Sequence, residues 1–130
     1  IGAVCIYDHI LGQDWRKDKV VADGLAWLDK NWSVTENMGP PESGKGHPQA
    51  YLLYYLYAVE RTGMLYDSEH IGAHKWYDEG AVYLLGSQGG NGAWKISTGK
   101  VGDTVDTCFA ILFLKRATRP MVASGTGRSK

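Results

Sequence analysis

Residues 80–94 carry the sequence GAVYLLGSQGGNGAW, and this stretch decides the fold. It begins as an amphipathic helix that ends near Gln88 in a turn of glycine and asparagine, residues that adopt a positive φ at little cost. The turn lets Trp94 fold back on the helix, where its indole would be buried while its N–H keeps a partner. The Gln88 amide would meet backbone groups at the helix end and lie against the indole. We name residues 80–94 the clasp and expect it to act as a packing device.

Composition sets limits on the fold and on the partners. The 130 residues, 44% of them hydrophobic, suffice for one domain with one core. Lys and Arg together number 14, as do Asp and Glu, so no basic face is expected and nucleic acid is excluded as a partner. The longest apolar run, 50–59, is too short to span a membrane. Cys5 and Cys108 lie in apolar runs and are predicted to be buried free thiols.

Hydrophobic periodicity predicts an all-α protein. The helices expected from it cover residues 1–11, 14–32, about 47–62, 73–88 and 103–116. The second helix is half polar, whereas the third is apolar almost all round, as is typical of a helix buried between others. Alternation with a period of two is missing, so strands are not expected. Residues 121–130 are small and polar, and we predict a disordered tail there.

An internal repeat organises these helices. A shift of 56 residues places 24–28 on 80–84 and also places 54–57 on 110–113. The repeat units would cover about 14–62 and 70–117 within a domain of residues 1–120. Half-polar helices would form an outer layer and apolar helices an inner one. The sequence therefore predicts an incomplete α/α toroid of about two and a half helical hairpins.

The motifs of the second unit resemble those of a known superfamily. The clasp, together with WYxxGA at 76–81 and DTxDTCFA at 103–110, is similar to the QW repeat of the squalene cyclase and protein prenyltransferase superfamily. The resemblance covers residues 1 to about 117. It implies a toroid in which about six helix pairs close a ring around a cavity, and this chain cannot close that ring. We expect a longer protein or a second copy to cover the open ends, since they would otherwise expose an apolar patch.

Two aspartates at the start of the last helix are the first candidate site residues. Squalene cyclases carry an Asp-x-Asp-Asp motif that protonates the substrate, and DTVDT at 103–107 departs from it. We favour Asp103 as the helix N-cap and Asp106 as a first-turn carboxylate that stabilises the positive helix end. Catalysis by Asp106 and ligand contact by Asp103 are the alternatives. Prenyltransferases bind zinc through an Asp-x-Cys pair and a downstream His, but no His follows His74. We therefore expect neither a metal nor a cofactor.

His47 and Tyr51 are the other candidate ligand-binding residues. By the 56-residue shift His47 is equivalent to Asp103, at the end of the ring where superfamily members have their cavity mouth. A role at the helix start is the favoured interpretation of His47, with ligand contact as the alternative. Tyr51 belongs to a set at helical spacing that predicts a core stripe more strongly than a pocket lining. That set comprises Tyr51, Tyr54, Tyr55 and Ala58.

The sequence indicates a class of function and leaves the ligand open. We favour a binding or structural repeat module of a larger protein that is not catalytic alone. Its concave side would carry His47, Tyr51, Asp103 and Asp106 near the mouth. A hydrophobic small molecule or a protein would be the partner, and the open ends would allow self-association. The alternatives are part of an isoprenoid-processing enzyme, cyclase-like or prenyltransferase-like, and a toroid that binds or processes polysaccharide. Tryptophans at 27, 32, 76 and 94 are predicted to bridge the layers.

Overall fold

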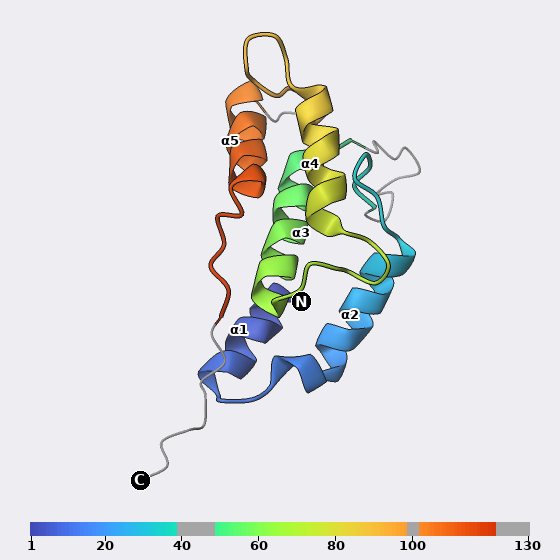
Figure 1. Ribbon diagram of the computed structural model, residues 1–130, viewed down its shortest axis with the longest axis vertical. Helices are drawn as coiled ribbons and strands as arrows, with labels where there is room; N and C mark the ends of the chain where they lie inside the picture. Colours follow the sequence, from blue (N-terminus) through green and yellow to red (C-terminus); the bar gives the residue numbers. More distant parts are fainter. Residues whose placement is uncertain (39–48, 99–101, 122–130) are drawn as a thin grey trace.

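A computed structural model describes residues 1–38, 49–98 and 102–121. The helices in these ranges are α1 (Gly2–Ile10), the short 3₁₀ helix η1 (Trp15–Lys17), α2 (Lys19–Lys30), α3 (Leu52–Tyr66), α4 (Trp76–Ser87) and α5 (Asp103–Leu114) (Figure 1). Within the same ranges the structure has no strand, only two isolated bridges. The prediction of an all-α protein is confirmed. The predicted tail falls outside the described residues, except for Met121.

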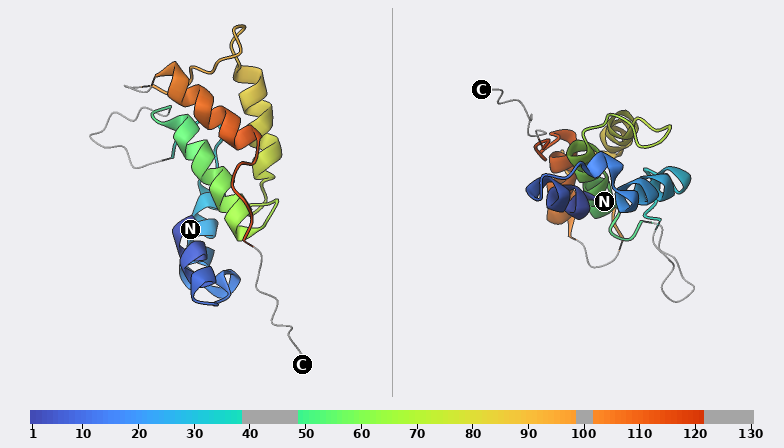
Figure 2. Two further views of the ribbon diagram at one scale, coloured as in Figure 1. Left: turned by 90° about the vertical axis from the view of Figure 1, so that its left-hand side faces the viewer. Right: turned by 90° about the horizontal axis from the view of Figure 1, so that it is seen from below.

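Helix α3 is the centre of the arrangement and packs against α1, α4 and α5. Helices α1 and α5 lie on one side of α3, whereas α2 and α4 lie on the other (Figure 1). Figure 2 shows α3 and α5 side by side. The apolar helices α1, α3 and α5 therefore form a row in which α3 contacts each of the other two. Helices α2 and α4 lie outside this row.

Local sequence explains where the helices around residue 18 begin. The Asp14 carboxylate accepts a hydrogen bond from the Arg16 amide at 3.2 Å and caps η1. The Asp18 carboxylate accepts from the amides of Val20 and Val21 at 2.7 and 3.2 Å and caps α2. Each such cap stabilises its helix by about 1 kcal/mol. The single helix predicted over 14–32 is thus two helices, because Asp18 has extended backbone angles and starts a new one.

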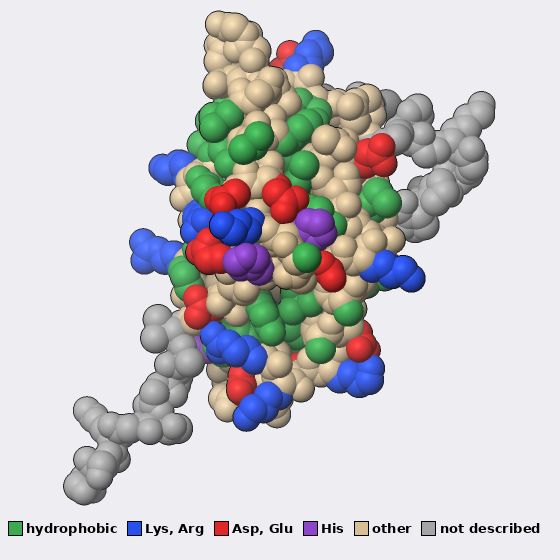
Figure 3. All heavy atoms as spheres, turned by 45° about the vertical axis from the view of Figure 1, so that its right-hand side comes forward, with side chains coloured by type: hydrophobic (Ala, Val, Ile, Leu, Met, Phe, Trp, Pro, Cys, Tyr) green, Lys and Arg blue, Asp and Glu red, His purple; other side chains and the backbone are tan. Residues whose placement is uncertain are grey.

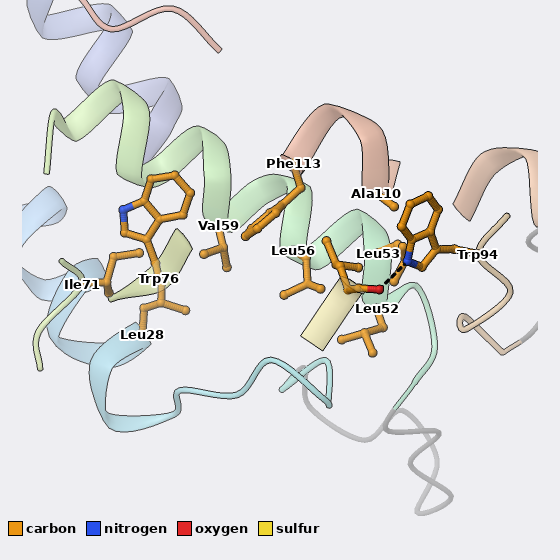
Figure 4. Close-up of a cluster of buried hydrophobic side chains, with 11 residues drawn as sticks. Leu28, Leu52, Leu53, Leu56, Val59, Ile71, Trp76, Trp94, Ala110 and Phe113 are labelled. Carbon is orange, nitrogen blue, oxygen red and sulfur yellow. Dashed lines mark hydrogen bonds between the residues drawn. The ribbon is translucent and has the colours of Figure 1, made fainter. Parts of the chain in front are cut away.

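The core lies between α3, α4 and α5, with α2 closing one end (Figure 4). Its fully buried large side chains include Trp76 and Phe113. Both rings fit only because a neighbouring helix presents a glycine: a Cβ on Gly63 would overlap the Trp76 indole, and a Cβ on Gly80 would overlap the Phe113 ring. The remaining buried members of the cluster are Leu28, Leu52, Leu53, Leu56, Val59, Ile71, Leu84, Trp94 and Ala110.

The clasp forms as predicted at Trp94. The Trp94 indole is buried and its Nε1–H donates to the Leu84 carbonyl oxygen at 2.8 Å (Figure 4). That carbonyl is in the last turn of α4, where helix carbonyls lack a partner from the helix itself. The Gln88 side chain donates to the Gly92 carbonyl at 2.8 Å, and Gly92 has a φ of 82°. The Gln88 amide thus forms a hydrogen bond within the glycine turn. The prediction had placed this amide against backbone groups at the helix end.

The predicted 56-residue repeat can be compared with the positions of the helices. Helices α2 and α4 begin at Lys19 and Trp76, which are 57 residues apart. Helices α3 and α5 begin at Leu52 and Asp103, which are 51 residues apart. Where a helix begins depends on its local cap as well as on any repeat, so the repeat and the equivalence of His47 with Asp103 stay predictions.

The core stripe predicted on α3 is also wrong. Tyr51 is 56% exposed and Tyr54 57% exposed, and Ala58 is exposed as well. The buried stripe starts at the next positions, with Leu52, Leu53, Leu56, Val59, Glu60 and Gly63. Leucine and valine fill this stripe without a hydroxyl that would need a partner. Tyr51 and Tyr54 lie at the surface, whereas Tyr55 is partly buried against the core.

Two further burial predictions fail. Cys5 is buried, whereas Cys108 is exposed on the outer edge of α5. Trp27 is 53% exposed and bridges no layers, although Trp76 and Trp94 are buried as expected and Trp32 is half-buried. The fifth tryptophan, Trp15, forms a second small core with α1 and α2. Apolar residues of α2 and α5 thus remain at the surface in the structure.

Candidate ligand-binding site

The described part of the chain contains a hollow of about 430 Å³ between the N-terminal ends of α3 and α5. We call it the α3–α5 hollow. Its size is within the range of small-molecule sites. Its lining residues are Tyr51, Tyr54, Ser97, Gly102, Val105, Asp106 and Phe109.

An extended segment after the clasp, residues 94–98, holds the two helices together at this end. The Thr98 amide donates to the Gln49 carbonyl at 3.1 Å, and the Ser97 hydroxyl accepts from the Leu53 amide at 3.3 Å. On the other side, the Trp94 amide donates to the Thr107 hydroxyl at 3.0 Å. The segment is thus tied to α3 and to α5, and it forms one wall of the hollow.

Asp106 makes the strongest connection to this segment. Its Oδ2 accepts from the backbone amides of Ile96 and Ser97 at 2.8 and 2.7 Å. Short hydrogen bonds from N–H groups to a carboxylate are among the stronger ones in proteins. Asp106 therefore anchors the wall of the hollow to α5, a role that sequence alone did not suggest.

The other oxygen of Asp106 has no such partner. The side chain is 1% exposed, and Oδ1 is buried without a hydrogen-bond partner among the described residues. Leaving a buried acceptor unsatisfied costs about 1–3 kcal/mol, and for a charged group more. Buried polar atoms in folded proteins are nearly always satisfied, so an exception calls for an explanation. A bound group that donates a hydrogen bond would provide one.

Aromatic rings cover the hollow. The Tyr54 and Phe109 rings meet edge to face at a centroid distance of 5.4 Å, and the Tyr57 ring lies 5.3 Å from Phe109. Tyr51 precedes α3 with a φ of 54°, in the left-handed region that non-glycine residues seldom occupy. Such strain is often found at ligand-binding positions. The tyrosines predicted as core thus form the lining of a site.

The structure separates the predicted site residues. Tyr51 and Asp106 line the same hollow. Asp103 does not belong to the lining; it is exposed and its carboxylate lies 3.5 Å from Lys95 Nζ. The N-cap of α5 is Gly102, so the prediction that Asp103 caps the helix is wrong, although both aspartates are in its first turn. His47 lies outside the described residues.

Four lining residues were not singled out from the sequence: Ser97, Gly102, Val105 and Phe109. Phe109 is three positions after Asp106 on the same helix, a spacing that places the two on one face. Val105 and Ser97 gave no comparable signal. Ser97 reaches the hollow only because the chain after the clasp runs back between α3 and α5.

Charge near the hollow also acts on a neighbouring tyrosine. Burial raises the pKa of the Tyr83 hydroxyl above its ordinary value, and the negative charge of Asp106 adds to this rise, while a hydrogen bond with Ser87 opposes it. Burial is the main cause of the raised pKa, and the charge of Asp106 is the smallest contribution.

Several charges elsewhere on the described surface are paired. Figure 3 shows a face on which acidic, basic and histidine side chains gather between areas of hydrophobic side chains. Arg116 binds Glu69 through two hydrogen bonds of 3.0 and 2.9 Å, and Lys75 lies 3.9 Å from Asp78. Within the described ranges, His, Cys, Asp and Glu side chains form no group of three or more suited to a metal ion.

The imidazole of His74 is part of a contact between α2 and the start of α4. It stacks on the Trp32 indole at a centroid distance of 4.9 Å, and the Trp32 Nε1–H donates to Glu79 at 2.6 Å. The Asp29 carboxylate accepts from the Ala73 amide at 3.0 Å. These contacts explain His74 as a packing residue that joins the end of α2 to the start of α4.

Comparisons with known proteins returned no relative. Family models, curated proteins and solved structures were all searched, and none matches the chain. Among the described helices, none has the length and apolar character needed to cross a bilayer. The function must therefore be inferred from the α3–α5 hollow itself.

Proposed function

We propose that this chain is a helical repeat module of the prenyltransferase and squalene cyclase-like class, and that it binds a small apolar ligand in the α3–α5 hollow. The observation that carries the proposal is the unsatisfied Oδ1 of Asp106 at a hollow lined by aromatic rings. Apolar walls with one well-placed polar group are the usual composition of ligand pockets. The ligand would have an apolar body and one hydrogen-bond donor.

The toroid is part of this proposal. It is supported by the row of α1, α3 and α5 with α2 and α4 outside it, and by the hydrogen-bonded clasp. Exposed apolar side chains at both ends of the row, such as Ile10 on α1 and Ile111 on α5, fit an open ring. Further helical repeats or a second copy of the chain would cover them.

Binding is favoured over catalysis because of what the hollow contains. Asp106 is its only acidic or basic side chain among the described residues. General acid catalysis of hydrolysis or transfer normally needs a second group that accepts a proton or attacks the substrate. On this basis Asp106 is a binding group in this chain.

One observation favours an isoprenoid-processing enzyme as the second candidate. A carboxyl group facing aromatic rings is the combination needed to protonate an alkene and to stabilise the resulting cation. That function would need residues from a longer protein. Polysaccharide binding is less favoured, because sugar-stacking tryptophans are not among the described lining residues.

An NMR titration with benzyl alcohol tests the binding proposal. This probe has an apolar ring and one hydroxyl donor, and we expect saturable chemical-shift changes at the amides of Ile96, Ser97 and Phe109. Tyr54→Ala should weaken binding several-fold because it removes a wall of the hollow. Tyr7→Ala is the matched control, since Tyr7 is similarly exposed but lies on α1. Shift changes scattered over the surface, or equal effects of the two variants, would refute the proposal.

A further inference from the structure

The described lining of the α3–α5 hollow carries a negative formal charge. Asp106 carries the only formal charge among its described lining residues. None of the ion pairs found among the described residues includes Asp106, and the nearby Lys95 is paired with Asp103. A carboxylate buried in an apolar wall is poorly screened by water, so its field extends into the hollow.

We infer that the ligand of this hollow is an organic ammonium, that is, an amine-bearing molecule with an apolar body. The inference rests on the proposed function and specifies its ligand. An ammonium group supplies both things that Asp106 lacks here, a hydrogen-bond donor for Oδ1 and a positive charge near the carboxylate. Hydrogen bonds between charged partners are roughly twice as strong as neutral ones.

The aromatic lining favours the same ligand. The faces of Tyr and Phe rings attract cations electrostatically, most strongly where water is excluded. Tyr51, Tyr54 and Phe109 all line the hollow, and the Tyr54 and Phe109 rings stand edge to face at 5.4 Å. A ring pair of this kind presents differently oriented π faces to one site. Carboxylate and rings therefore select positive charge together, and an anionic ligand would be repelled by both.

The position of Oδ1 limits the shape of the ligand. This oxygen has less than 1 Å² of exposed surface, so it lies behind the wall of the hollow. A bulky quaternary ammonium group could use only the charge and the rings. A primary ammonium group is small and has N–H donors, so it needs a smaller rearrangement of the lining to reach this oxygen. We therefore expect the ligand to be a primary amine.

A matched series of ligands tests the charge preference. Benzylammonium, benzyl alcohol and benzoate share one ring and differ in charge, and their dissociation constants can be obtained by NMR titration of the full chain at neutral pH. We expect benzylammonium to bind about 10-fold more tightly than benzyl alcohol, because both donate a hydrogen bond to the carboxylate and only the ammonium adds a positive charge. Benzoate should not bind measurably.

Asp106→Asn is the decisive variant. Its amide oxygen can still accept from the Ile96 and Ser97 amides, so the wall should stay in place while the negative charge is lost. We expect the 10-fold preference for benzylammonium to fall to about 2-fold or less, because the asparagine amide has no charge and presents N–H donors where Oδ1 was. Asp103→Asn removes an equal charge from the same helical turn outside the hollow and should preserve the preference.

The outcomes separate the two proposals. Equal affinity of the wild-type chain for benzylammonium and benzyl alcohol would overturn the ammonium inference and leave the binding function intact. Failure of both ligands to bind would overturn both. A preference that survives Asp106→Asn, in a variant whose Ile96 and Ser97 amides keep their hydrogen-exchange protection, would also refute the inference, because the charge that selects the ligand would then be a different one.

Discussion

The Trp76 indole lies directly against the backbone of α3 at Gly63, with no room for a Cβ between them. The indole Nε1–H donates to the Ser68 carbonyl at 2.7 Å, just after the end of α3. Trp76 is also the first residue of α4. This one contact therefore fixes the start of α4 against the C-terminal half of α3.

Gly63→Ala should destabilise the protein because the added methyl group would overlap the Trp76 ring. We expect a loss of about 1–3 kcal/mol in the free energy of unfolding, the usual cost of overpacking a core, measured by urea denaturation. Gly86→Ala is the matched control: Gly86 is in α4 with no atom near its Cβ position, so alanine should stabilise by about 0.5–1 kcal/mol. Equal effects of the two variants would contradict the contact.

Trp94→Phe tests the clasp. Phenylalanine keeps most of the buried ring but loses the hydrogen bond to the Leu84 carbonyl, which would remain buried and unsatisfied. The expected cost is about 1–3 kcal/mol in unfolding free energy. Trp27→Phe on the exposed side of α2 should change stability by less than about 0.5 kcal/mol. A Trp94→Phe variant as stable as Trp27→Phe would show that the clasp bond is unimportant.

Asp106→Ala should loosen the wall of the α3–α5 hollow. The change removes the acceptor for the Ile96 and Ser97 amides, and we expect hydrogen exchange at these two amides to accelerate at least 10-fold, about 1.4 kcal/mol or more. Asp106→Asn retains one acceptor oxygen and should preserve most of the protection. If the alanine variant exchanged at the wild-type rate, Asp106 would not anchor this segment.

The two cysteines should differ in reactivity toward iodoacetamide. Cys108 is exposed, whereas burial raises the pKa of the Cys5 thiol and hides it from the reagent. Because the thiolate is the reactive form, Cys108 should be alkylated first and Cys5 only after unfolding. Mass spectrometry of peptides from native and urea-treated protein measures the extent of alkylation at each cysteine. Labelling of Cys5 at the rate of Cys108 in native protein would contradict the buried position.

Tyr55 should make the protein less stable at high pH. Burial raises the pKa of its hydroxyl above the ordinary value of 10.0, so above that pH the unfolded chain releases a proton that the folded chain keeps. The contribution of Tyr55 is therefore complete below pH 10 and declines as the pH rises toward the folded pKa, by at most about 1.4 kcal/mol per pH unit. Urea denaturation between pH 8 and 11 should give a shallower decline for Tyr55→Phe, as judged against Tyr7→Phe at an exposed position.

The helices and the clasp could be predicted because their signals are local. Apolar spacing, glycine and asparagine in the turn, and Gln88 before it are all within one short stretch, and the structure confirms the bond from Trp94 to Leu84. The all-α class could be predicted for the same reason, because hydrophobic periodicity is a local signal. Where neighbouring positions compete for the core, the sequence was ambiguous: Leu52 and Leu53 are buried, and Tyr51 and Tyr54 are not.

The hollow could be predicted only in part. Tyr51 and Asp106 were expected near the same mouth, and both line the hollow, whereas Asp103 was expected there and lies outside the lining. The anchoring role of Asp106 depends on amides of Ile96 and Ser97, which any residue types would supply. A backbone donor leaves no signature in the sequence.

The clasp has a consequence for how such proteins can grow. The bonds that close its turn begin and end inside it: Gln88 to Gly92, Gly89 to Ala93 and Trp94 to Leu84. A gene duplication that copies residues 80–94 would therefore copy a helix ending together with its return. The following helix would still have to supply the packing that Phe113 and Thr107 of α5 give to Gly80 and Trp94 here.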